Sequence, residues 1–117
     1  MALIGDAASN SDPTWGQGLS MALRDARVLA QALAAHEDWD AAGIAYSQER
    51  SQYHGVIHTV EDWQSTVLMS TGAEADALRE KVLPSWSADR SRHPDTFIAG
   101  PGPTLDEAAR RRFFGED

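Results

Sequence analysis

The sequence predicts a mainly α-helical protein with one short strand at its N-terminus. Apolar residues recur every three or four positions over about 16–36 and again over about 39–69, which is the spacing of one helix face. The first apolar run, residues 1–4, is too short for a helix and ends at a glycine. Serine, proline and glycine become frequent after residue 84, which is typical of irregular structure.

The composition is that of one small soluble domain or of a piece of a larger one. The 117 residues are 42% hydrophobic and 24% charged, and none is cysteine. A disulfide framework and a thiolate metal site are therefore excluded. No stretch approaches the roughly 18 consecutive apolar residues of a membrane span, and no signal pattern is seen. We expect a cytoplasmic protein without a membrane partner.

The net charge of −8 is unevenly distributed. Residues 37–80 carry nine acidic and two basic side chains, whereas residues 81–117 carry six of each. An acidic surface disfavours nucleic acid, whose phosphates require clustered Lys and Arg. The basic run Arg110–Arg112 is short, and we expect it to form a solvated or salt-bridged helix face.

The chain is predicted to open with the strand Met1–Ile4 and a polar loop over Ser9–Thr14. A first helix should begin between Gly16 and Gly18 and end near His36. Its apolar residues share one face, and the small ones among them would let another element approach closely. They are Leu19, Ala22, Leu23, Ala26, Leu29, Ala30 and Leu33.

A second, longer helix is predicted from about Trp39 to Met69, with Asp38 as its N-cap. Residues seven apart form a seam suited to packing against another helix. They are Tyr46, Tyr53, Val60 and Val67. Trp39 and Trp63 are also expected to pack in the core. Gly55 weakens the helix by roughly 1 kcal/mol relative to Ala and marks a candidate bend.

A shorter third helix is predicted to begin at Gly72 or Ala73, because Thr71–Glu74 has the spacing of a capping box. Pro84 should stop or kink it. An irregular arm is expected over residues 85–103.

A short C-terminal helix should then follow. A second capping-box pattern, Thr104–Glu107, is expected to open it, and it should continue to Arg112. The chain thus divides into three predicted segments. They are a strand-loop-helix segment at 1–36, a helical continuation at 37–84, and the arm with the final helix at 85–117.

Two histidines four residues apart, His54 and His58, could face one zinc ion from one side of the second helix. However, Gly55 occupies the position where the helix of a zinc protease carries its catalytic Glu, and no third ligand is evident. We expect no metal site.

The N-terminal strand, loop and helix start carry the clearest chemical signal. A carboxylate just past the strand, Asp6, can accept hydrogen bonds from sugar or polyol hydroxyls. Backbone N–H groups at the helix start, made accessible by Gly16 and Gly18, can stabilise negative charge on a ligand. This pattern predicts a corner of the molecule that faces an anion or a cofactor.

The same corner resembles the second flavin-binding motif of the FAD-dependent aromatic hydroxylases, the single-component monooxygenases similar to p-hydroxybenzoate hydroxylase. The resemblance lies in Leu3-Ile4-Gly5-Asp6-Ala7-Ala8, Pro13, Gly16-Gln17-Gly18 and Asp25-Ala26. This chain has Ser9 where the family often has His, and Ser20 where it often has Asn.

The resemblance implies FAD as the cofactor and a role for each part of the motif. Asp6, which follows Gly5, would bind the ribityl chain of FAD, and Pro13 would lie beside the reacting edge of the flavin ring. The helix start would face the pyrimidine edge and stabilise its negative charge when the ring is reduced. The residues concerned there are Gly16, Gln17 and Gly18.

For the complete enzyme, the resemblance implies reduction of FAD by NAD(P)H and hydroxylation of an aromatic or related organic substrate. The family's Gly-x-Gly-x-x-Gly turn for the pyrophosphate is not found in this sequence. We therefore expect the C-terminal part of such a flavoprotein, a fragment of an α/β FAD-binding fold that is inactive alone. No catalytic acid, base or nucleophile is assigned within it.

The expected partners are FAD and an N-terminal dinucleotide-binding portion, or a second copy of the chain, to cover the strand and the apolar helix face. Two alternatives stay open. The chain could be a non-catalytic helical interaction module or split-enzyme subunit. It could also be a freestanding helical protein that has lost independent FAD binding.

Overall fold

The computed structural model describes residues 1–94, 96 and 100–117. Across these residues the secondary structure is helical and includes no strand, which confirms the mainly α fold class. The chain forms two compact units, residues 1–55 and 56–117. The division into three functional segments stays a prediction. No helix in the described part is both long enough and apolar enough to cross a membrane.

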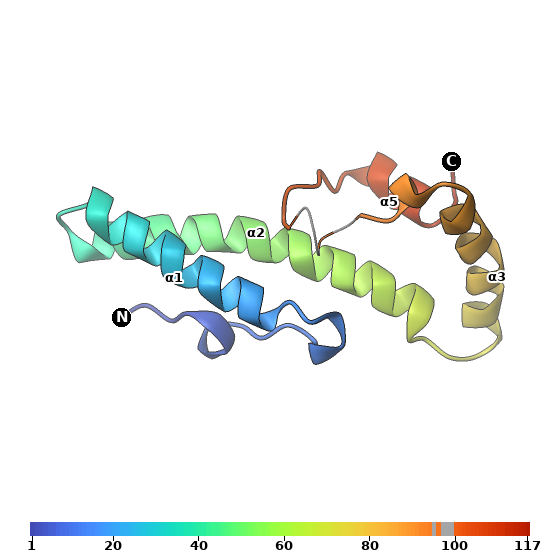
Figure 1. The fold of residues 1–117 in the computed structure, drawn as a ribbon, viewed down its shortest axis with the longest axis horizontal. Helices are drawn as coiled ribbons and strands as arrows, with labels where there is room; N and C mark the ends of the chain where they lie inside the picture. The colour runs from blue at the N-terminus through green and yellow to red at the C-terminus, as the bar shows by residue number, and fades with distance from the viewer. Residues whose placement is uncertain (95, 97–99) are drawn as a thin grey trace. The chain divides into compact units, whose positions relative to one another are not determined.

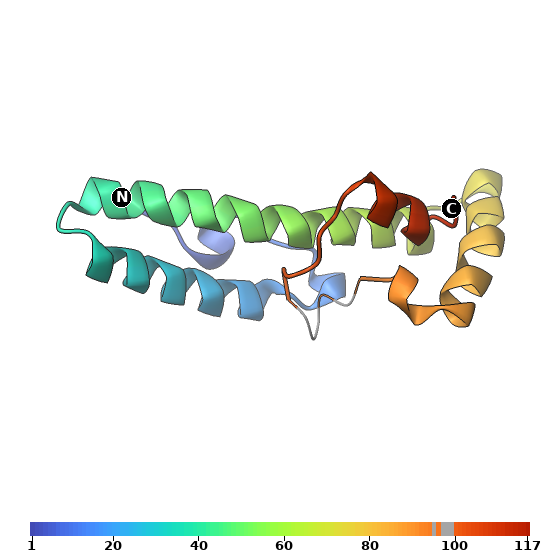
Figure 2. The same cartoon turned by 90° about the horizontal axis from the view of Figure 1, so that it is seen from above.

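The first unit contains two short 3-10 turns and two long helices. Helix α1 and the first part of α2 lie side by side and run antiparallel (Figure 1, Figure 2). The elements are η1 (Gly5–Ala7), η2 (Pro13–Trp15), α1 (Gly18–Ala35) and the beginning of α2 (Trp39–Leu68). Asp38 caps α2 as predicted, because its Oδ1 accepts a hydrogen bond from the Asp40 N–H at 3.0 Å.

The strand predicted at Met1–Ile4 does not form. Ile4 has extended dihedral angles, with φ −130° and ψ 160°, but no second strand is present among the described residues. A lone extended segment has no neighbour with which to form ladder hydrogen bonds. It is held instead by the Tyr46 hydroxyl, which donates to the Leu3 carbonyl oxygen at 2.8 Å.

Helix α1 packs through a different face from the predicted one. Its buried residues are Met21, Asp25, Val28 and Ala32. In the predicted stripe, Leu19 is 74% exposed, Leu23 64% and Leu33 43%. These three leucines of the predicted face are therefore uncovered in this chain.

The seam on α2 is buried along its length, as its sevenfold spacing predicts. The helix continues through Gly55, so the candidate bend does not interrupt it. Trp39 was expected in the core, and this is wrong, because it is 80% exposed in the first turn of α2.

The second unit packs around an aromatic core. It contains the end of α2 together with α3 (Ala73–Ala88), η3 (Arg90–Arg92) and α5 (Glu107–Phe113). The core residues are Val67, Val82, Phe113 and Phe114, with Trp63, Leu78 and Trp86 packed against them. The Trp63 ring lies 5.4 Å from that of Phe113, which confirms its predicted place in the core.

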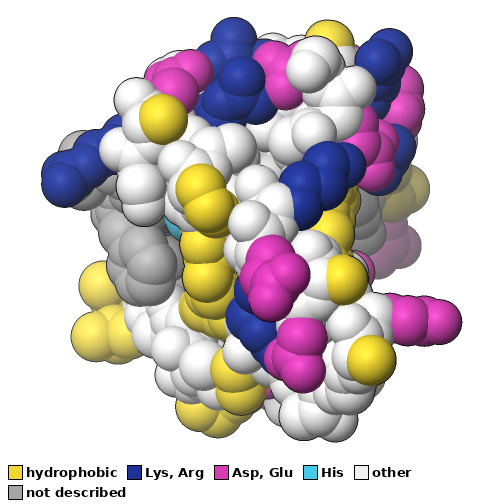
Figure 3. Space-filling view, turned by 90° about the vertical axis from the view of Figure 1, so that its right-hand side faces the viewer, with side chains coloured by type: hydrophobic (Ala, Val, Ile, Leu, Met, Phe, Trp, Pro, Cys, Tyr) yellow, Lys and Arg dark blue, Asp and Glu magenta, His cyan; other side chains and the backbone are white. Residues whose placement is uncertain are grey.

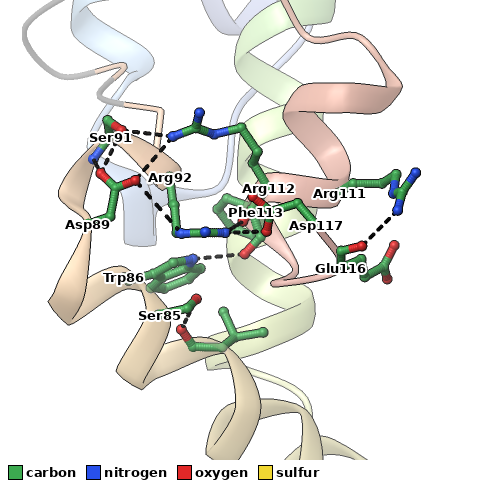
Figure 4. Close-up of polar contacts among 11 residues, drawn as sticks. Ser85, Trp86, Asp89, Ser91, Arg92, Arg111, Arg112, Phe113, Glu116 and Asp117 are labelled. Atoms are coloured by element: carbon green, nitrogen blue, oxygen red, sulfur yellow. Dashed lines mark hydrogen bonds and ion pairs between the residues drawn. The ribbon is translucent and has the colours of Figure 1, made fainter.

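Helix α3 does not end at Pro84 but continues to Ala88. The turn after the proline is held by tertiary contacts, since Trp86 Nε1 donates to the Phe113 carbonyl oxygen at 2.8 Å (Figure 4). The two rings also lie 4.7 Å apart. These contacts offset the hydrogen bond that a proline removes from a helix.

Neither predicted capping box forms. Gly72 precedes α3 without a side-chain cap. Helix α5 is capped by Asp106, whose Oδ1 accepts from the Ala109 N–H at 2.8 Å. Because α3 continues to Ala88, the irregular arm begins after that residue and not at residue 85 as predicted. Residues 95 and 97–99 of the arm lie outside the described residues.

In the basic run, Arg110 and Arg112 pair with acids, as predicted, and Arg111 donates to the Glu116 carbonyl oxygen at 2.9 Å. Arg110 contacts Glu107 at 3.0 Å and Glu116 at 2.6 Å, and Arg112 contacts Asp89 at 3.2 Å (Figure 4). The space-filling view likewise shows Lys and Arg side chains beside Asp and Glu (Figure 3). Exposed pairs of this kind add little stability, but they neutralise the run as a cationic patch.

The aromatic core of the second unit gives the first prediction. Phe113 is fully buried, so Phe113→Ala should lower the free energy of unfolding by about 3–5 kcal/mol through lost burial and a cavity. Leu83→Ala, at a 38% exposed position on α3, should change it by less than about 1 kcal/mol. Urea denaturation followed by circular dichroism measures both, and similar small losses would contradict the assigned core.

Candidate cofactor-binding site

The predicted cofactor corner is built from η1, η2 and the first turn of α1. The predicted residues occupy defined positions at the ends of these elements. Gly5 and Asp6 begin η1, Pro13 begins η2, Gly16 follows η2 with φ 66°, Gln17 precedes α1 and Gly18 opens it. The glycine-flanked start of the first helix is therefore where the motif predicts it.

The structure brings Asp6 next to the start of α1. A Cβ added to Gly18 would lie 3.8 Å from Asp6 Oδ1 and 3.9 Å from Ser11 Oγ. Asp6 is exposed, and the first N–H groups of a helix have no partner within it. A carboxylate acceptor and backbone donors thus lie side by side around an open glycine.

Two side chains in the loop between Asp6 and Gly18 have buried polar atoms that no described residue pairs. These atoms are Ser11 Oγ and Trp15 Nε1. Buried polar atoms are normally hydrogen-bonded, so this loop suits a ligand that carries hydrogen-bonding groups. Ser11 is not one of the predicted site residues. Only its position between Asp6 and Pro13 in the sequence could have suggested that it lies at the site.

Gly5 is required by its backbone and by its packing. Its φ is +56°, and a Cβ there would lie 3.2 Å from the Ala22 Cβ. A side chain would therefore be strained by the dihedral angle and would press on α1. The small residue at Ala22 allows the close approach that the alanines of this helix predict.

The Gly5 backbone is tied to α1 by a buried carboxylate. The Gly5 N–H donates to Asp25 Oδ2 at 2.7 Å, and Asp25 is completely buried. Arg50 Nε donates to the same oxygen at 3.0 Å. The Tyr53 hydroxyl donates to Oδ1, and His54 Nε2 lies 3.5 Å from that oxygen. Asp25 therefore joins the N-terminal segment, α1 and α2.

The surroundings keep Asp25 ionised. Burial would raise its pKa, but hydrogen bonds from Tyr53, Gly5 and Arg50 outweigh burial and hold the pKa below its usual value. Burial, and the hydrogen bond to this carboxylate, raise the pKa of the Tyr53 hydroxyl well above its usual range. The Arg24 guanidinium lies over the Tyr53 ring, 4.6 Å from its centre.

This network could only partly be foreseen from the sequence. Asp25 belongs to the motif, but no role was assigned to it. Arg50 is one of two basic residues in the acidic stretch 37–80, and Tyr53 lies on the buried seam of α2. Their convergence on Asp25, which is 25 and 28 positions earlier, is visible only in the fold.

The two histidines considered for zinc have different carboxylate neighbours. His54 lies beside Asp25, whereas His58 Nδ1 lies 3.2 Å from Glu61 Oε2. Within the described residues, no group of three or more potential ligands is placed to hold a metal ion.

An open groove lies in the first unit beside this network. It is bordered by the N-terminal segment, α1 and the start of α2, and its wall is largely apolar. The larger apolar residues in the wall include Met1, Leu3, Leu29, Leu33, Trp39 and Ile44. Arg50, which contacts Asp25, also borders it.

Comparison with known proteins gives an independent result for this region. A family model described as "FAD binding domain" matches residues 1–63, which include the corner and the Asp25 network. No solved structure gives a significant match.

Three curated proteins, all named kynurenine 3-monooxygenase, match a larger part of the chain. The protein from Salinispora arenicola is 37% identical over 92 residues, covering 72% of this chain and 20% of that protein. The Salinispora tropica protein is 36% identical with the same coverage. The Mycosarcoma maydis protein is 31% identical over 100 residues, covering 74% of this chain and 16% of that protein. The chain thus spans about a fifth of the length of these relatives.

The lowered pKa of Asp25 predicts how the fold responds to acid. A carboxyl whose pKa is lower in the folded state than in the unfolded state stabilises the fold when the pH is above its unfolded pKa of about 4. This stabilisation is lost as the pH falls through the folded pKa. Asp25→Asn should therefore be less stable than wild type at about pH 7, and the difference should shrink toward about pH 3. Urea denaturation across this range measures it.

The exposed Asp62 provides the control, since Asp62→Asn alters a surface side chain and should change stability little. A deficit of Asp25→Asn that stays constant down to about pH 3 would show that folding does not lower the pKa of Asp25.

Proposed function

The chain belongs to the FAD binding domain family, whose cofactor is FAD, and on this premise we propose that it supplies the flavin-ring and ribityl side of the FAD site in a monooxygenase. The observation that carries the proposal is the position of Asp6 beside Gly18 at the start of α1. This arrangement combines an acceptor for hydroxyl groups with donors for a ring that becomes negatively charged.

The residues of the corner fit such a ligand. The exposed Asp6 carboxylate can accept hydrogen bonds from the ribityl hydroxyls. The N-terminal end of α1, a helix of 18 residues, carries a partial positive charge that favours a negatively charged ligand. The buried Ser11 Oγ and Trp15 Nε1, which no described residue pairs, add polar atoms on the same loop.

We assign the remaining motif residues to the flavin ring. Pro13 lies beside the reacting edge, and the turn formed by Gly16, Gln17 and Gly18 faces the pyrimidine edge. When bound, FAD supplies the redox chemistry, and the protein binds, orients and electrostatically tunes it. Nothing in this assignment requires an acid, base or nucleophile from this chain.

The complete protein would be an NAD(P)H-using monooxygenase that hydroxylates an aromatic or related organic substrate. The name shared by the three relatives supports this class and makes kynurenine the first substrate to test. Because the chain spans about a fifth of their length, the substrate-binding residues would come mostly from outside it.

The uncovered surfaces of the first unit support a partner. Three apolar surfaces favour a covering partner. They are the exposed leucines of α1, the apolar groove and the extended segment before Gly5, which has no strand beside it within the described residues. We propose that an N-terminal dinucleotide-binding portion covers them, in the same chain or as a separate subunit. The same surfaces favour self-association as the second candidate, and the mass in size-exclusion chromatography with light scattering distinguishes the two.

Asp6 gives the test of the proposed site. In a chimera, this chain replaces the matching segment of the Salinispora arenicola enzyme. Asp6→Ala should weaken FAD binding by about 1–3 kcal/mol, because hydrogen bonds to hydroxyls are lost. Flavin fluorescence titration measures the dissociation constant.

Glu49→Ala is the matched control, since it removes an exposed acid from α2 and should leave FAD affinity unchanged. Equal affinities of the Asp6→Ala chimera and the parent chimera would contradict the assignment of Asp6 to the ribityl chain.

A further inference from the structure

The buried carboxylate of Asp25 is hydrogen-bonded to the backbone of Gly5, the residue directly before Asp6, which we propose binds the ribityl chain of FAD. Its Oδ2 accepts the Gly5 N–H at 2.7 Å, and Gly5 is followed by Asp6. On its other side, the Gly5 carbonyl oxygen accepts from Ala8 N at 2.9 Å and Ser9 N at 3.2 Å. Both faces of the Gly5 backbone are therefore fixed, one by η1 itself and one by α1.

The carboxylate is in turn held in a single orientation from α2. Arg50 Nε contacts Oδ2 at 3.0 Å, while Tyr53 donates to Oδ1. Because each oxygen has its own donor from α2, rotation of the carboxylate about its bond to Cβ would break contacts on both sides. The position of Gly5 is therefore fixed relative to both α1 and α2.

Stability alone does not explain an ionised group at this position. Burying a charge is costly even when it is paired, and apolar residues of similar size often serve stability as well or better. The next buried residue on the same face of α1 is an ordinary apolar one, Val28. What the carboxylate provides in addition is a directional acceptor for the Gly5 N–H.

We infer that Asp25 is a positioning residue of the flavin site, which fixes Gly5 and so directs Asp6 toward the start of α1. Arg50 and Tyr53 keep the Asp25 carboxylate aligned for this task. The inference that the positioned site binds FAD rests on the proposed function. The positioning itself rests on the hydrogen bonds of Gly5.

Amide hydrogen exchange in the 117-residue chain tests the positioning without any ligand. In Asp25→Ala, exchange at the Gly5 N–H should rise about tenfold or more relative to the interior amides of α1 and α2. Val28→Ala truncates a buried residue on the same helix face and should raise exchange at Gly5 no more than elsewhere. Equal ratios in the two variants would overturn the inference.

A milder variant covers the case in which Asp25→Ala does not fold. Tyr53→Phe leaves Asp25 ionised and removes one of the two donors from α2 that align it. Relative exchange at Gly5 should rise about threefold in this variant, and no selective rise would overturn the inference.

FAD affinity in the chimera provides the functional readout. Asp25→Ala should raise the dissociation constant for FAD about tenfold, whereas Val28→Ala should leave it unchanged despite a lower melting temperature. Loss of affinity in both variants in proportion to lost stability would show a merely structural role and overturn the inference. If the parent chimera does not bind FAD, the proposed function fails, and exchange at Gly5 then decides whether Asp25 positions this corner.

Discussion

The hydrogen bonds of one buried, ionised aspartate hold the elements of the first unit together. Asp25 connects the N-terminal segment through Gly5 with α2 through Arg50 and Tyr53. Its burial is tolerated because donors on both oxygens outweigh the loss of water. The hydroxyl of Tyr46 adds a second tie, from α2 to the Leu3 carbonyl. These polar contacts, together with the close approach of Gly5 to Ala22, hold the N-terminal segment and the start of η1 against α1 and α2.

The same unit leaves much of its apolar surface uncovered. The buried face of α1 is the one that carries Asp25, whereas Leu19, Leu23 and Leu33 on the predicted face are exposed. The extended segment before Gly5 has no strand beside it among the described residues. A corner that is internally fixed but surrounded by unpaired apolar surface is what we expect of one side of a site whose other side lies elsewhere in the protein.

Local patterns in the sequence predicted the helices, their approximate ends and the FAD family, which the family match confirms. They did not predict which face of α1 is buried, because helical spacing reveals an apolar stripe but not what covers it. Nor did they predict that α3 continues past Pro84, where the contact of Trp86 with Phe113 supports the last turn. At α5 the capping side chain is Asp106 rather than the predicted Thr104. The Asp25 network joins residues too far apart in sequence for any spacing argument, and the contacts of Asp6, Pro13 and Gly16–Gly18 with flavin stay predictions.

We propose that this chain holds one side of a flavin site and needs a complement to hold the cofactor. Titration of FAD into the isolated chain and into the chimera with the Salinispora arenicola enzyme, followed by flavin fluorescence, tests it most directly. We predict stoichiometric binding by the chimera and no tight binding by the isolated chain. Tight stoichiometric binding by the isolated chain, or none by the chimera, would contradict the account.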